Sequence, residues 1–214
     1  MKQPPLRYVG DKRIREALRK YDCPTPFHAV RTRFLGNIAT PRLDASPIEA
    51  VKDLWGGELP PFEDMDAANA LLQDLMSFWN HLTRHQSRSK PFRLVHVSAK
   101  PTRDDLLGLC RTRSEELEGF VDGLFGGDEE VDLPERAAAG MDRLGEINAM
   151  ILGVLHLLDD QSQSPTETEL GDTLRNVNEL SRIAEQELHD VILACVRARR
   201  QSLAQGSTRR PTFH

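Results

Sequence analysis

Apolar residues recur every three or four positions along most of this chain, which is the spacing of one face of an α-helix. Stretches with this spacing begin near Ile14, Phe27, Ile48, Ala68, Leu106, Ala138 and Leu170. The segment Phe92–Val97, between Pro91 and Pro101, has some strand character and also fits a merely extended chain. The pattern therefore predicts an all-α, multi-helix bundle.

Several polar residues stand where an N-cap is expected, directly before these stretches. The segment Ser46-Pro47-Ile48-Glu49 has the spacing of a capping box, in which serine and glutamate bond each other's backbone N–H groups. We predict further helix starts at Asp64 and Thr102 and in three segments that contain a proline: Thr25 with Pro26 at the first helical position, Asp132-Leu133-Pro134-Glu135 and Ser164-Pro165-Thr166-Glu167.

The last apolar stretch is the longest, and its spacing alternates between four and three residues, as in a coiled-coil seam. The seam consists of Leu170, Leu174, Val177, Ser181, Ala184, Leu188, Val191 and Cys195. A second stripe through Leu180, Ile183 and Ile192 makes the apolar face wider than a two-helix zipper needs. We therefore expect a long amphipathic helix at 165–205 that packs on its own 1–160 helical domain, with self-association as the alternative, followed by a disordered tail at 206–214.

Two segments of the chain, 70 residues apart, resemble each other. Val51–Glu58 and Val121–Asp128 both read valine, two residues, leucine, an aromatic residue, Gly-Gly and an acid. Glycine without a Cβ atom suits the left-handed residue that ends a helix, so both segments predict a helix followed by a reversal and an acidic link. The similarity fits either an internal duplication or chance.

The first of these segments, with the helix that follows it, carries a resemblance to a known family. Leu54–Asp64, within 46–82, and Gly119-Phe120-Val121-Asp122-Gly123-Leu124 resemble motifs of the YecA/YgfB-like family of uncharacterised bacterial proteins. The resemblance covers about half of the chain and implies an all-α domain, with no activity or catalytic residues to carry over. Many members end in a cysteine-rich zinc module, which this sequence lacks.

Composition places the chain among ordinary globular proteins, with 39% hydrophobic and 29% charged residues. The longest apolar run, 149–158, is much shorter than the ~20 residues of a membrane span, and the first residues lack the apolar core of a signal peptide. Three scattered cysteines, Cys23, Cys110 and Cys195, give no disulfide framework. These features predict no membrane association and a cytoplasmic location.

Charge is unevenly distributed around a net value of −5. Residues 1–33 carry nine Lys/Arg against three acids, 115–135 carry nine acids and no Lys/Arg, and 196–214 carry five arginines and no acid. Such segregation is typical of solvated helix faces, and it also fits an acidic partner for the basic ends.

Candidate chemistry is sparse. His81 and His85 share a helix face and could approach His96, but zinc needs a third and usually a fourth ligand. Cys23 and His28 could form a nucleophilic pair, although a cysteine before proline in a turn is more typically structural. The acidic run Asp128–Asp132 lacks the spacing of a calcium loop. We assign no catalytic residue, cofactor site or metal ligand from the sequence.

Three functions compete on this basis. The favoured one is a non-enzymatic protein-interaction or regulatory module that uses the 165–205 helix. The second is binding to nucleic acid or the ribosome through the N-terminal basic segment and through Arg197, Arg199, Arg200, Arg209 and Arg210. The least favoured is a metal-dependent enzyme built from the histidines and acidic loops.

Overall fold

A computed structural model describes residues 7–127, 130–162 and 164–208, and every regular element in this part of the chain is a helix. The α-helices are α1 (Asp11–Lys20), α2 (Phe27–Ala39), α3 (Pro47–Lys52), α4 (Met65–Leu82), α5 (Arg103–Phe125), α6 (Glu135–Asp159) and α7 (Glu167–Thr208), with short 3-10 helices η1 (Asp53–Trp55) and η2 (Thr83–Gln86). The predicted all-α multi-helix fold with a long C-terminal helix is confirmed. None of the described helices is long and apolar enough to cross a membrane.

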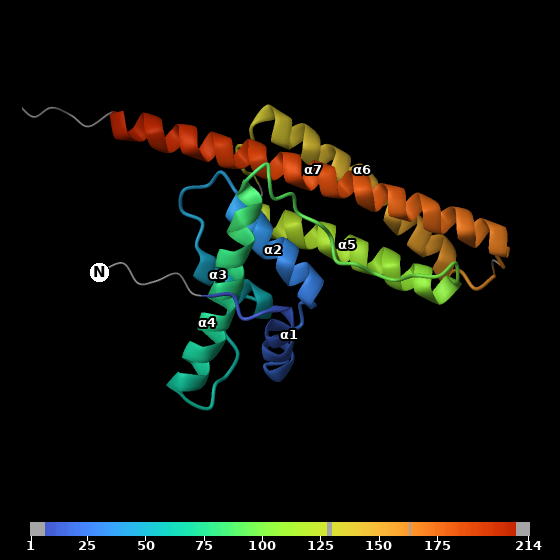
Figure 1. Cartoon of the computed structure of the whole chain (residues 1–214), viewed down its shortest axis with the longest axis horizontal. Coiled ribbons are helices and arrows are strands. Elements are labelled where there is room, and N and C mark those ends of the chain that lie inside the picture. Colours follow the sequence, from blue (N-terminus) through green and yellow to red (C-terminus); the bar gives the residue numbers. More distant parts are fainter. Residues whose placement is uncertain (1–6, 128–129, 163, 209–214) are drawn as a thin grey trace, which may run out of the picture.

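The helices form an elongated three-helix part and a cluster of shorter helices beside it (Figure 1). In the long part α5, α6 and α7 run side by side, with α6 packed on both α5 and α7. The shorter helices α1, α3 and α4 gather around α2, which connects them to the long part by packing along α5. The α2–α5 contact is therefore the joint between the two parts.

Glycines allow the backbones of α2 and α5 to lie close together at this joint. Gly119 and Gly123, one turn apart on α5, face α2, and Gly36 on α2 faces α5. A Cβ atom added at Gly119 would lie 2.7 Å from the carbonyl oxygen of Ala29, and one at Gly36 would lie 2.6 Å from the amide nitrogen of Leu124. Backbones can approach this closely only where side chains are absent. The Gly-Phe-Val-Asp-Gly-Leu motif of the sequence is thus a packing motif.

The seam of α7 packs inside the molecule. Val177, Ala184, Leu188 and Val191 are fully buried, in the same apolar cluster as residues of α2 and α5. These four seam residues therefore pack against other helices of the described chain. The helix begins at Glu167 and continues to Thr208, so positions 206–208 of the predicted tail are helical, and 209–214 lie outside the described residues.

An extended segment, 91–99, runs between α5 and α7 and bonds side chains of both helices (green in Figure 1). It contains the stretch 92–97 that was predicted to be strand-like or extended. Its backbone N–H groups bond side chains of other elements instead of a neighbouring strand. Glu116, fully buried on α5, accepts the Val95 N–H (2.7 Å), and Glu185 on α7 accepts the Leu94 N–H (3.0 Å). These carboxylates satisfy backbone donors that would otherwise be buried without partners.

A buried arginine completes this arrangement. Arg113 donates to the Glu116 carboxylate (2.5 Å), the Val95 carbonyl (2.9 Å) and the Ser181 hydroxyl of α7 (3.0 Å). Its guanidinium group therefore joins α5, the extended segment and α7 at one point. Burial raises the pKa of Glu116, and Arg113 opposes that increase.

The helix starts agree with the sequence at three positions and differ at three. Ser46, Asp64 and Thr102 each accept the expected backbone N–H with the side chain. The predicted caps Thr25 and Asp132 are wrong, because in both places the proline itself, Pro26 or Pro134, is the extended residue before the helix. The predicted Ser164 cap is also wrong: the Thr166 hydroxyl accepts the Glu169 N–H (3.3 Å), and the Glu169 carboxylate accepts the Thr166 N–H (2.7 Å).

Both Gly-Gly segments end their helices in the same way. Gly56 and Gly126 are left-handed C-terminal caps, with φ of 81° and 61°, and Gly57 and Gly127 also have positive φ. Leu54 and Leu124 are both fully buried, whereas Val51 is buried and Val121 is 38% exposed. The helix-reversal geometry is shared, and duplication of the whole unit stays a prediction.

Candidate functional site

The three histidines that suggested a metal site lie in different environments. His81 stacks on the Tyr8 ring, with ring centroids 4.0 Å apart. His85 is buried, and its Nδ1 donates to the Lys90 carbonyl (2.8 Å) while its Nε2 accepts from Arg84 (3.3 Å). His96 is exposed on the extended segment. No group of three or more His, Cys, Asp or Glu side chains in the described part of the chain could hold a metal ion.

The Cys23 and His28 side chains also have separate partners. The Cys23 thiol lies 3.5 Å from the Thr25 carbonyl and 3.6 Å from that of Leu54, and burial raises its pKa. His28 pairs instead with Glu115 on α5 (2.5 Å). A thiol with a raised pKa and no imidazole partner among the described residues is a poor nucleophile.

The acidic run Asp128–Asp132 falls partly outside the described residues, at 128–129. Its later part, 130–132, is a partly exposed link before α6. The Asp132 side chain does not cap that helix. The run therefore offers no described cation site.

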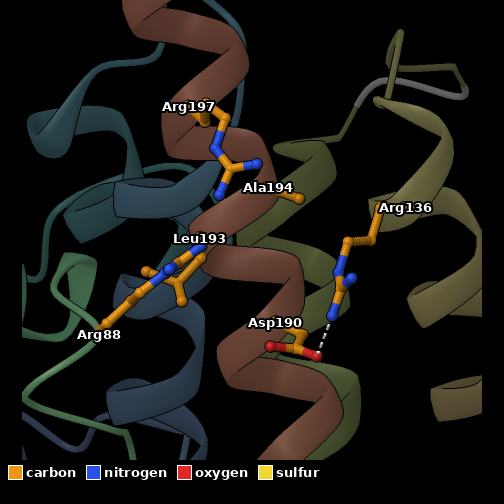
Figure 2. Close-up of a pocket in the computed structure, with 6 residues that line it drawn as sticks. All are labelled: Arg88, Arg136, Asp190, Leu193, Ala194 and Arg197. Carbon is orange, nitrogen blue, oxygen red and sulfur yellow. Dashed lines mark hydrogen bonds and ion pairs between the residues drawn. The ribbon is translucent and has the colours of Figure 1, made fainter.

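A basic groove along the C-terminal half of α7 is the feature of the surface with the clearest chemistry. Two adjoining pockets of about 130 and about 380 Å³ share Arg88, Leu193 and Arg197. Figure 2 shows the guanidinium groups of Arg88, Arg136 and Arg197 around the same stretch of α7. Arg200 extends this basic groove by one further turn of the helix.

Three separate elements place the arginines of the basic groove. Arg197 and Arg200 are one turn apart on α7, and Arg136 lies at the start of α6, which packs against α7. Arg88 lies in the turn after η2, which is closed by the Lys90 N–H bonding the Ser87 carbonyl (3.0 Å). The buried His85 holds the same turn through the Lys90 carbonyl, so Arg88 is carried on a fixed loop.

The charges of the basic groove are only partly balanced. Arg136 donates to Asp190 on α7 (2.7 Å). Arg88, Arg197 and Arg200, all exposed, have no carboxylate within salt-bridge distance among the residues that the structure describes. Three unpaired cations around one hollow attract anionic groups, because their potentials add.

The neighbouring Arg199 has a different role. It is half-buried and donates to the Thr40 carbonyl at the C-terminus of α2 (3.2 Å), where the helix leaves its last carbonyls unsatisfied. Burial lowers its pKa. Of the arginines that the sequence grouped together, Arg197 and Arg200 therefore face the groove, Arg199 anchors α7 to α2, and Arg209 and Arg210 lie outside the described residues.

The floor of the basic groove is apolar. Leu193, Ala194 and Val196 line it between the arginines, and none of the residues that line the two pockets is aromatic. Such a surface suits a ligand that presents both carboxylates and aliphatic groups. The arginines that α7 contributes to the basic groove could be predicted from the sequence. Arg88 and Arg136 could not, because only the fold brings these distant positions to α7.

Comparisons of the chain with models of protein families, with curated proteins and with solved structures gave no match.

Proposed function

We propose that this protein is a non-enzymatic helical module that binds an acidic segment of a partner protein in the basic groove. The observation that carries the proposal is the convergence of Arg88, Arg197 and Arg200, all without described carboxylate partners, on an apolar floor. Charge-assisted bonds from guanidinium groups to carboxylates supply specificity, and aliphatic side chains of the ligand cover Leu193 and Val196. We also propose that the protein is related to the YecA/YgfB-like family and that it is located in the cytoplasm.

A protein ligand fits the basic groove better than nucleic acid does. A long polyanion would be repelled by a molecule whose net charge is −5, whereas a short acidic segment meets only the basic groove. Proteins that bind single-stranded nucleic acid also stack bases on aromatic side chains. The basic groove has none.

The test measures the affinity of fluorescent peptides by anisotropy. One peptide alternates glutamate with leucine, and its partner has glutamine in place of every glutamate. We expect the acidic peptide to bind at least about tenfold more tightly than the neutral one, since each lost charge-assisted bond weakens binding by about that factor. The triple substitution of Arg88, Arg197 and Arg200 by Gln should remove this preference.

A matched control replaces three exposed arginines that lie away from the basic groove, Arg7, Arg19 and Arg111, by Gln. This variant loses the same net charge and should keep the peptide affinity of the unmodified protein. Equal loss in both triple variants would contradict the proposal, because it would mean that net charge alone attracts the peptide. Tighter binding of a single-stranded RNA than of the acidic peptide would replace the proposal by nucleic-acid binding.

A further inference from the structure

A third pocket, of about 450 Å³, lies beside the first Gly-Gly junction. The end of α1 and the link that follows η1 line it. The residues that line it include Tyr21, Trp55, Pro60 and Pro61. The Trp55 indole N–H donates to the Tyr21 carbonyl (2.8 Å), and Tyr21 packs edge-on against Phe62, with centroids 5.3 Å apart. Both aromatic walls are therefore held in place before any ligand arrives.

Lys20, Asp22 and Glu58 are the charged residues that line this aromatic pocket, so two of its three charges are negative. Asp22 and Glu58 line it, both are exposed, and neither forms an ion pair with a described cation. Asp22 is the one residue other than glycine with positive φ (46°) in the described part of the chain. This left-handed residue ends α1 in a Schellman-type cap, in which the Cys23 N–H donates to the Leu18 carbonyl (2.9 Å) and the Asp22 N–H donates to the Arg19 carbonyl (3.2 Å).

The aromatic wall already accepts a cation from the chain itself. The Lys20 ammonium lies 5.0 Å from the centroid of the Tyr21 ring. Tyr and Trp faces attract cations, and they attract the planar guanidinium of arginine well because it stacks on the ring while its edge still donates hydrogen bonds.

At the second Gly-Gly junction an arginine of the chain itself is bonded to a backbone carbonyl. There Arg42 donates to the carbonyl of Phe125 (3.0 Å), directly before the Gly126 cap, and makes a bidentate pair with Asp44 (3.1 and 3.0 Å). The corresponding residue of the first junction is Trp55. None of the described side chains donates to the Trp55 carbonyl.

We infer that the first junction takes an arginine from a partner peptide, in the pocket between Tyr21 and Trp55, as the second junction takes Arg42 from its own chain. The guanidinium would stack on the aromatic walls and pair with Asp22 and Glu58. This site lies on a different surface from the basic groove, is of opposite charge, and does not rest on the function proposed for that groove.

The experiment uses the full chain and follows its two tryptophan indole N–H signals by NMR. Trp55 is at the pocket, and Trp79, which donates to Asn37 (3.1 Å), serves as an internal reference. The probe is a short glycine peptide with one arginine, compared with the same peptide carrying citrulline, which keeps the shape and loses the charge. We expect the arginine peptide to shift the Trp55 signal and leave Trp79 in place, and the citrulline peptide to bind about tenfold more weakly.

Two double variants complete the test. Asp22→Asn with Glu58→Gln should weaken binding of the arginine peptide about tenfold, and asparagine tolerates the left-handed backbone of Asp22. Asp142→Asn with Glu146→Gln, both exposed on α6, removes the same charge elsewhere and should bind normally. The inference is overturned if Trp55 does not respond, if citrulline binds as tightly as arginine, or if both double variants weaken binding equally.

Discussion

Gly123 on α5 lies directly against the backbone of Arg33 on α2. A Cβ atom at Gly123 would come within 2.7 Å of the Arg33 carbonyl carbon and 2.9 Å of its Cα, closer than real Cβ atoms approach. The Arg33 side chain meanwhile donates to the Asp53 carbonyl (3.0 Å) and pairs with Asp122, so it bonds residues just before each Gly-Gly junction. The close helix contact thus ties the two junctions to one residue of α2.

This relationship predicts that Gly123→Ala is severely destabilising. The new methyl group would overlap backbone atoms that cannot move away as a side chain can, so we expect a loss of about 3 kcal/mol or more in the free energy of unfolding. Urea denaturation followed by circular dichroism measures it. Gly145→Ala is the control, since Gly145 lies within α6 with open space around its Cβ position, and it should stabilise by about 0.5–1 kcal/mol. Similar effects at both positions would contradict the close contact.

Removing one partner of the buried Arg113–Glu116 pair should also be costly. Glu116→Gln leaves the guanidinium buried without its charge partner, and we expect the free energy of unfolding to fall by about 3–5 kcal/mol. Glu179→Gln on the surface of α7 breaks a similarly spaced pair with Arg182, in which both side chains are more than half exposed, and should cost less than about 1 kcal/mol. Comparable losses in urea denaturation would show that the buried pair contributes no more than the exposed one.

Acid should destabilise the protein through His85. Burial lowers the pKa of His85, the cations Arg84, Arg31 and His81 lower it further, and its hydrogen bond to Lys90 opposes the decrease. The unfolded chain therefore takes up a proton at a higher pH than the folded one. Stability is full above about pH 6.5 and falls as the pH drops below that value towards the lowered folded pKa.

Urea denaturation at a series of pH values measures this effect in three proteins. His85→Asn should show a smaller loss between about pH 6.5 and pH 5 than the unmodified chain, and the asparagine amide can still donate to the Lys90 carbonyl. His156→Asn, exposed on α6, should leave the pH dependence as it is. An unchanged slope in His85→Asn would show that other groups cause the acid sensitivity.

The arginines of α7 should separate into a structural and a binding class. Arg199→Ala removes the hydrogen bond to the Thr40 carbonyl and should lower the free energy of unfolding by about 1–2 kcal/mol. The Arg197 side chain forms no hydrogen bond or ion pair with a described residue. Arg197→Ala should therefore change the free energy of unfolding by less than about 0.5 kcal/mol and should instead weaken binding of the acidic peptide. Thermal unfolding and peptide anisotropy on the same two variants measure both effects.

The presence of the helices could be predicted from the sequence, because apolar periodicity and capping residues are local properties. The caps at Ser46, Asp64 and Thr102 follow from residues within one turn. The start of α7 was misplaced because two overlapping capping boxes fit the sequence, Ser164 with Glu167 and Thr166 with Glu169, and only the second forms. Local pattern cannot choose between such neighbours.

The candidate sites could not be predicted in the same way. The basic groove joins Arg88 and Arg136 to α7, and the pocket of the first junction joins Tyr21 to Trp55; these pairings depend on how helices pack. The four-residue spacing of His81 and His85 did not predict a shared metal ion. The His81 ring stacks on an aromatic ring, whereas His85 bonds a backbone carbonyl.

The extended segment at 91–99 has a consequence for synthesis on the ribosome. On α7, Glu185 bonds the Leu94 N–H of this segment and Ser181 bonds Arg113 of α5, so these two bonds form only after α7 has been synthesised. During that interval the apolar sides of α5 and α6 that α7 later covers remain in contact with water or with a chaperone. A nascent chain stalled before α7 therefore exposes this apolar surface, which favours aggregation.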